Sequence, residues 1–409
     1  MHLKTKVSLW LVLFVVFLDF MGFGLVYPMF SSMLFLPDNS LLADKTSDHV
    51  RGIYLGILLA VPSIAQFFSG PILGSLSDQK GRKPLFLWSI GLAVFGYMSC
   101  ILGVLINSIL CLILARFIIG IASGNAGVAC ATIADLSEPK EKAKFFGLYS
   151  MALGIGFTVG PFLGGKFSET NFILPFVIAG IATILNWVLI YFFFKETLTQ
   201  RTKATLSFTE GLKNLKKAFH MYNLRTLFVT VMIFCFGWSF FYEFMPVTWI
   251  LEFKFNPSKI GLFYAYGAAF YALSSGFLIR PFLNRFKHLS IIFYSLATLG
   301  CLIFSIAFSS HVFLIWIYLP IINFLTALIF PTYSAMVSDS VDKNSQGEIL
   351  GILQSVEAVA LGLSPLAAGA MLAAHPHMPM FLGGSAILLA TILFGLLLRK
   401  KIFLNQTKS

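Results

Sequence analysis

The sequence predicts an all-α integral membrane protein of twelve transmembrane helices, arranged as two pseudo-symmetric six-helix bundles. Of its 409 residues, 58% are hydrophobic and only 11% are charged, whereas soluble domains are about 25% charged. Apolar runs of about 20 residues recur from end to end, each long enough to cross a hydrocarbon layer of about 30 Å. The expected runs are residues 8–36, 52–76, 84–107, 109–134, 144–168, 172–194, 225–251, 258–283, 288–308, 311–338, 347–374 and 377–398.

The distribution of positive charge predicts how these helices cross the membrane. Most of the 29 Lys and Arg residues lie in alternate connections between the runs. Cytoplasmic loops carry such an excess, so we expect both termini in the cytoplasm and the protein in the cell inner (plasma) membrane. The net charge of +12 then reflects topology, and no nucleic-acid partner is expected. The cations expected on the opposite side are Lys45, Arg51, Lys166, Lys254 and Lys259.

The second and third runs are separated by an abrupt polar connection of about eight residues. It contains an acid, a glycine turn and cations in the pattern Gly-x-Leu-x-Asp-x-x-Gly-Arg-Lys. So short a connection predicts antiparallel flanking helices. The residues of the pattern are Gly74, Asp78, Gly81, Arg82 and Lys83.

An internal repeat supports the division into two bundles. An acid, a glycine, a proline and a glycine follow one another with the same spacing twice, 204 residues apart. Duplicated halves with a substrate site between them are a recurring transporter plan. The alternative is that glycine and proline mark tight helix packing wherever they occur. The two sets are Asp135, Gly147, Pro161 and Gly165, and Asp339, Gly351, Pro365 and Gly369.

The repeat predicts an N-terminal bundle at residues 1–194 and a C-terminal bundle at residues 225–409. The linker between them, residues 195–224, carries seven cations. Apolar residues recur in it at helical spacing, opposite lysines, which predicts an amphipathic helix in the membrane interface. The apolar residues are Phe208, Leu212, Leu215 and Phe219, and the lysines are Lys213, Lys216 and Lys217.

The fifth run contains a stripe of glycines. Gly156, Gly160 and Gly164 recur every four residues and therefore share one helix face, which would let a neighbouring helix approach closely. Pro161 lacks a backbone donor and is expected to bend the helix, and Gly165 follows the stripe. These residues form a helix-packing motif.

Four charged residues lie well inside the apolar runs, away from the ends, where charge is costly and a functional role is the default hypothesis. At 1.5 Å per residue, Asp19 lies about 16 Å and Arg116 about 27 Å from the cytoplasmic ends of their runs. A carboxylate near a cation can hold or release a proton as its surroundings change. Asp19, Arg116 and Glu357 are therefore candidates for proton coupling, the alternative for the first two being a permanent ion pair. Glu357 is equally a candidate ligand for a cationic substrate, or a polar contact between helices. Glu243 is a candidate residue of the substrate cavity, where it would face an outer vestibule.

Other polar side chains within the runs are candidates for a substrate cavity or for hydrogen bonds between helices. The five cysteines occur singly, so neither a disulfide nor a metal site is expected. A nucleotide-binding loop and a nucleophile–base set are also absent from the sequence, so neither a cofactor nor an enzymatic activity is expected. The polar candidates are Gln66, Asn125, Asn323 and Gln354.

The connection at Asp78 resembles the signature loop of major facilitator superfamily transporters. Arg116 followed by Gly120, and the glycine–proline run that includes Gly160, resemble motifs of the drug:proton antiporter branch, which includes the tetracycline/proton antiporters. Ile119 stands where the family pattern usually has Gln. The resemblance implies the major facilitator fold, with the first and fourth helices lining a central cavity. It also implies that the Asp78 loop acts in gating and that Arg82 contacts Asp135 at the end of the fourth helix.

These observations predict a secondary active transporter that exports an amphipathic small molecule or drug in exchange for protons. Within transport, the alternatives are export of an endogenous metabolite or siderophore, or uptake by proton symport. The alternatives from other functional classes are a transport-inactive sensor and a channel, and the repeat argues against a channel. The expected partners are the substrate, protons and the lipid bilayer, and the protein is expected to be a monomer.

Overall fold

The computed structural model confirms the twelve membrane spans expected from the sequence. It describes residues 3–36, 41–43, 45–137, 142–198, 209–221, 224–308, 311–341, 346–372 and 375–406. In these residues, all of the regular secondary structure is helical, and twelve segments are long and apolar enough to cross a membrane. The segments are Val7–Phe35, Asp48–Lys80, Arg82–Leu105, Ile109–Leu136, Phe145–Ser168, Leu174–Phe193, Arg225–Phe253, Pro257–Arg285, His288–Ile306, Val312–Ser338, Ile349–Met371 and Met378–Leu397.

The chain divides into two compact units, which are described separately. Each unit contains most of one half of the sequence and the beginning of one helix from the other half. The second span thus begins in unit 2, and the eighth span begins in unit 1. Unit 1 consists of residues 1–46, 57–210 and 254–268, and unit 2 of residues 47–56, 211–253 and 269–409.

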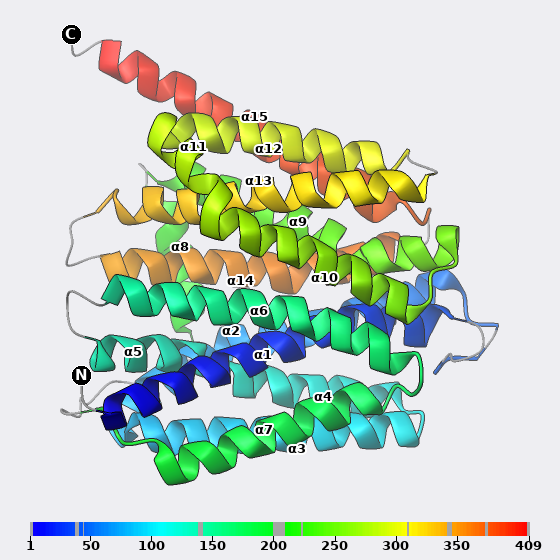
Figure 1. Ribbon diagram of the computed structural model, residues 1–409. Helices are drawn as coiled ribbons and strands as arrows, with labels where there is room; N and C mark the ends of the chain where they lie inside the picture. The colour runs from blue at the N-terminus through cyan, green and yellow to red at the C-terminus, as the bar shows by residue number, and fades with distance from the viewer. Residues whose placement is uncertain are drawn as a thin grey trace. The chain divides into compact units, whose positions relative to one another are not determined.

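In unit 1, α1 packs along α6 and α7, and α3 packs on α4 and α7 (Figure 1). The fourth span consists of two helices, α4 and α5, joined by a 3-10 turn at Ser123–Asn125. Ser108 caps the start of α4, because its side chain accepts a hydrogen bond from the backbone N–H of Cys111 at 3.3 Å. The helices are α1 (Leu3–Phe35), α2 (Asp48–Lys80), α3 (Arg82–Leu105), α4 (Ile109–Ala122), α5 (Ala126–Leu136), α6 (Lys142–Ser168), α7 (Leu174–Phe193) and the first part of α10 (Pro257–Leu273).

In unit 2, α9 packs on α14 and α15, and α12 packs on α13 and α15 (Figure 1). The eighth span is completed by a π-helical turn at Ser274–Leu278 and by α11. The helices are α8 (Glu210–His220), α9 (Arg225–Phe253), the remainder of α10, α11 (Ile279–Arg285), α12 (His288–Ile306), α13 (Val312–Ser338), α14 (Gln346–Met371) and α15 (Met378–Gln406).

The connection between α2 and α3 is shorter than the sequence predicts. Gly81 alone separates the two helices, with a φ of +107°, a conformation that glycine adopts without strain. The polar residues before it continue α2 to Lys80, and the Gly81 N–H donates to the Ser77 carbonyl oxygen at 3.0 Å. Polarity ends the apolar run here but does not end the helix, because helical backbone hydrogen bonds do not require apolar side chains.

The linker contains the expected amphipathic helix as α8. Leu212 and Phe219 are 49% and 37% exposed, whereas Gly211 and Ala218 are buried. Phe208, which the sequence places on the apolar side, lies outside the described residues. The helix thus keeps large apolar side chains on its surface.

Candidate functional site

Asp19 lies halfway along α1 and is half-buried, with the side chain of Asn125 next to its carboxylate. Asn125 belongs to the turn between α4 and α5, is 2% exposed, and donates from Nδ2 to Ser89 Oγ at 3.1 Å. Among the described residues, the Asn125 Oδ1 atom has no hydrogen-bond partner. The polar side chains of Asp19, Asn125 and Ser89, from three different helical segments, therefore lie together within the membrane-spanning helices.

Arg116 is 2% exposed in α4, and its Nε donates to the Leu58 carbonyl oxygen at 3.3 Å. Its guanidinium carbon lies 6.0 Å and 5.8 Å from the ring centroids of Phe23 and Phe30. Aromatic faces attract a cation at about this distance. Within the described part of the chain, the ion pairs do not include one between Arg116 and Asp19. The cation is held by a carbonyl oxygen and aromatic rings.

Arg82 is the centre of a charge cluster at one end of unit 1. Its NH1 atom donates to Asp78 Oδ1 at 2.6 Å and to the Ser77 hydroxyl, and its Nε donates to Asp135 Oδ2 at 3.2 Å. The expected contact between Arg82 and Asp135 is therefore present. The Arg82 side chain is 6% exposed, while those of Asp78 and Asp135 are 42% and 30% exposed. The cluster joins the end of α2, the start of α3 and the end of α5.

Glu196 completes this end of the unit and was not identified from the sequence. Its carboxylate oxygens accept hydrogen bonds from the backbone N–H groups of Arg82 at 2.9 Å and Lys83 at 3.1 Å, at the start of α3. It also accepts from the N–H groups of Thr197 and Leu198, both at 3.0 Å. Burial would raise the pKa of Glu196, but the four backbone donors outweigh burial and lower it. Glu196 therefore acts as an ionised cap of α3.

The glycine stripe of α6 packs against the backbone of α1. Each glycine faces a carbonyl oxygen one turn further along α1, so a Cβ atom would collide with the backbone itself. The close approach expected from the stripe is present, and the partner helix belongs to the same unit. The facing pairs are Gly156 with Phe17, Gly160 with Met21, and Gly164 with Leu25.

The proline–glycine pairs of the repeat make equivalent contacts in the two units. In unit 1, a Cβ atom on Gly165 of α6 would lie 2.8 Å from the Gly261 Cα atom of α10. In unit 2, a Cβ atom on Gly56 of α2 would lie 3.1 Å from the Pro365 carbonyl carbon of α14. In unit 1, the start of α10 thus packs closely against the backbone of α6. In unit 2, the start of α2 packs in the same way against α14, at the corresponding position of the repeat.

Glu357 lies in α14 and is half-buried. The buried Tyr333 of α13 donates from its hydroxyl to Glu357 Oε1 at 2.6 Å. The rings of Phe234 and Phe330 lie 6.3 Å and 5.7 Å from the Tyr333 ring. Among the described ion pairs, none includes Glu357. Its carboxylate is held by one hydroxyl group beside an aromatic cluster.

The other polar candidates differ in their surroundings. Glu243 is 7% exposed in α9 and accepts a hydrogen bond from Ser239 at 2.8 Å. Gln66 donates to the Ser123 carbonyl oxygen at 3.1 Å, which is a contact between helices, and Asn323 donates to Leu319 within its own helix at 2.8 Å. Gln354, in contrast, is exposed on α14, one turn before Glu357.

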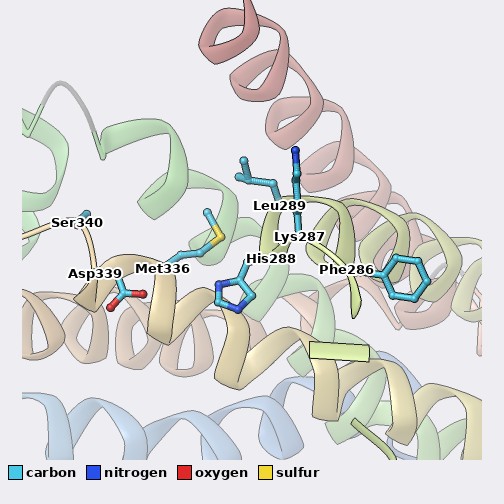
Figure 2. A pocket seen from close by; sticks show the side chains of 7 residues that line it. All are labelled: Phe286, Lys287, His288, Leu289, Met336, Asp339 and Ser340. Atoms are coloured by element: carbon cyan, nitrogen blue, oxygen red, sulfur yellow. The ribbon is translucent and has the colours of Figure 1, made fainter. Parts of the chain in front are cut away.

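A surface cavity of about 520 Å³ opens in unit 2 between the start of α12 and the end of α13. In Figure 2, His288 and Asp339 point toward the same space and Phe286 points away. Asp339 is the repeat counterpart of Asp135, yet in the described residues no ion pair includes it. The two units therefore differ in charge pairing at this place. The lining residues are Phe286, Lys287, His288, Leu289, Met336, Asp339 and Ser340.

Comparison with known proteins identifies the family. The family model described as Major Facilitator Superfamily matches residues 9–365. The tetracycline resistance protein, class H, of Pasteurella multocida is 27% identical, covering 88% of this chain and 87% of that protein. The quinolone resistance protein NorA of Staphylococcus aureus is 26% identical, covering 90% and 91%. The crystal structure of a bacterial homologue of the human lysosomal transporter Spinster has a TM-score of 0.76 at 14% identity, with 98% of both chains covered, and shows the same fold. The chain belongs to the Major Facilitator Superfamily and is a secondary transporter, not an enzyme.

Proposed function

We propose that this transporter exports an amphipathic small molecule or drug in exchange for protons, by alternating access. The observation that carries the proposal is the position of Asp19 in the middle of a membrane-spanning helix, beside Asn125. An ionised carboxylate is costly in such a layer, whereas a protonated one costs much less. Similarity along most of the chain to proteins named for tetracycline and quinolone resistance supports a drug-like substrate.

Five of the polar side chains have a role in this proposal. Asp19 takes up and releases the proton, and the Asn125 amide can pair with either form of the carboxyl group because it holds both a donor and an acceptor. Arg116 supplies a fixed positive charge in the same unit, and Glu357 is a second coupling candidate. Gln354 is exposed on the same helix as Glu357 and is the favoured polar residue of a substrate cavity.

The proposal includes an orientation. In this proposal both termini lie in the cytoplasm, because the alternate connections carry most of the Lys and Arg residues. The proposal also takes the protein to be a monomer in the cell inner (plasma) membrane. The charge cluster of Arg82 then lies at the cytoplasmic face. The ion pairs of Arg82 join Asp78 at the end of α2 to Asp135 at the end of α5, and we propose that this junction, with the Gly81 turn, acts as a gating element. Residues 1–194 and 225–409 are the two repeated bundles.

Two alternatives within transport remain distinct hypotheses. Export of an endogenous metabolite or siderophore would use the same coupling residues with a different substrate. Proton symport would use them with both fluxes in one direction. The direction of the proton gradient that drives accumulation separates symport from antiport, because the two mechanisms require opposite gradients.

The test is transport by the purified protein in liposomes with an imposed pH gradient, screened with dyes, antibiotics and iron chelators. Antiport predicts that substrate accumulates in the compartment that is losing protons, and that an ionophore that collapses the gradient abolishes accumulation. The control is protein carrying Asp48→Asn, an exposed acid at the start of α2, which is expected to behave as wild type. Accumulation that persists after the pH gradient is collapsed would contradict the proposal.

A further inference from the structure

The α8 helix carries two neighbouring surfaces that together fit an anionic lipid bilayer. Leu212 and Phe219 are exposed and lie seven residues apart, so they share one helix face. Exposed lysines occupy the adjacent face. Large apolar side chains beside lysines are typical of helices that lie in the membrane interface. The lysines are Lys213, Lys216 and Lys217.

The opposite face of α8 is attached to unit 2. Gly211 and Ala218 are buried, and Asn214 Nδ2 donates to Ser355 Oγ of α14 at 3.2 Å. Ser355 precedes Glu357 by two residues, and its hydroxyl also donates to the Gly351 carbonyl oxygen at 2.9 Å. On one side, α8 therefore presents apolar side chains and lysines that suit a lipid surface. On the other side, it contacts α14, the helix that carries Glu357.

We propose that α8 binds the anionic phospholipid headgroups of the cytoplasmic leaflet, and that this contact positions α14 through Asn214 and Ser355. The inference rests on the proposed orientation, because anionic lipids are concentrated in that leaflet. The lysines meet the lipid phosphates, and Leu212 and Phe219 enter the boundary of the acyl chains. Each lysine contributes about a fivefold preference for an anionic over a neutral surface, which salt weakens because the Debye length is only about 8 Å.

The direct test is amide hydrogen exchange of residues 209–221 in the full chain. The protein is compared in nanodiscs of phosphatidylethanolamine mixed with either phosphatidylglycerol or phosphatidylcholine. We expect exchange to be about fivefold slower or more with the anionic lipid. Changing Lys213, Lys216 and Lys217 together to Gln should remove the difference, while changing all three to Arg should keep it. Equal exchange in the two lipids, or a difference that survives the Gln changes, would refute lipid binding and favour a soluble partner.

The link to α14 is tested with Asn214→Ala, which removes the hydrogen bond but leaves the lysines in place. In this variant, amide exchange of α8 should still be slower with the anionic lipid, as in wild type. Any acceleration of transport that phosphatidylglycerol causes in wild type should be lost. Acceleration that persists in this variant would refute the link. Exchange of α3 serves as a folding control in every variant. Because the exchange measurement needs no transport, failure of the proposed function would leave this test of lipid binding intact.

Discussion

At the scale of single residues, the clearest role is that of Glu196. Its carboxylate accepts four backbone hydrogen bonds and fixes the start of α3 beside Arg82. Substitutions of helix-capping residues cost about 0.5–2 kcal/mol. We therefore expect Glu196→Gln to lower the free energy of unfolding by about 1 kcal/mol at neutral pH. Thermal unfolding in detergent measures this, with Asp48→Asn as the matched change of an exposed acid.

The pH dependence of this effect follows from the lowered pKa of Glu196. The ionised cap stabilises the folded state above the ordinary pKa of 4.5, and the stabilisation is lost as the pH falls through the lower folded-state pKa. The stability difference between Glu196→Gln and wild type should therefore be full at pH 7 and shrink below about pH 4.5. A difference that does not change with pH would show that the cap does not depend on charge.

The sequence predicts the residue-scale features unevenly. Asp19, Arg116 and Glu357 could be found because a charge inside an apolar run is conspicuous. Glu196 could not, because an acid just beyond a run is ordinary until the fold brings it to the start of α3. Tyr333 was missed because aromatic residues occur throughout the spans, and sequence spacing does not reveal which hydroxyl contacts Glu357.

At the scale of the helices, the contact between α1 and α6 depends on glycine. A Cβ atom on Gly164 would collide with the Leu25 carbonyl oxygen, whereas a Cβ atom on Gly154 meets nothing within 4 Å. We expect Gly164→Ala to cost about 1–3 kcal/mol by overpacking and to impair transport. Gly154→Ala should be neutral or stabilising by up to about 0.8 kcal/mol, because alanine favours helix.

Thermal stability and transport of these two variants test the packing directly. Equal behaviour of Gly164→Ala and Gly154→Ala would contradict the role of the stripe. The sequence predicted both the stripe and the spans well, since both follow from periodicity and run length. It could not identify α1 as the partner, because glycine spacing defines a helix face but not the helix that meets it. The lengths of the apolar runs likewise could not predict that Gly81 alone connects α2 to α3.

At the scale of the whole molecule, the repeat relates the two halves without making them equivalent. Asp135 and Asp339 occupy corresponding positions, but Asp135 binds Arg82 whereas Asp339 lines an open cavity. The intramembrane charges also differ, with Asp19 and Arg116 in unit 1 and two acids, Glu243 and Glu357, in unit 2. The shared spacing of acid, glycine and proline therefore does not extend to the charge pairing of each half, which depends on residues that the spacing pattern does not predict.

The central claim is that Asp19 carries the coupled proton, and Asp19→Asn tests it most directly. The amide keeps the shape of the side chain but cannot titrate. Gradient-driven accumulation and exchange of substrate for substrate are measured on one purified preparation in liposomes, together with its thermal stability. We predict that accumulation is lost while exchange and stability are retained. A stable variant that still concentrates substrate with the pH dependence of wild type would contradict the claim.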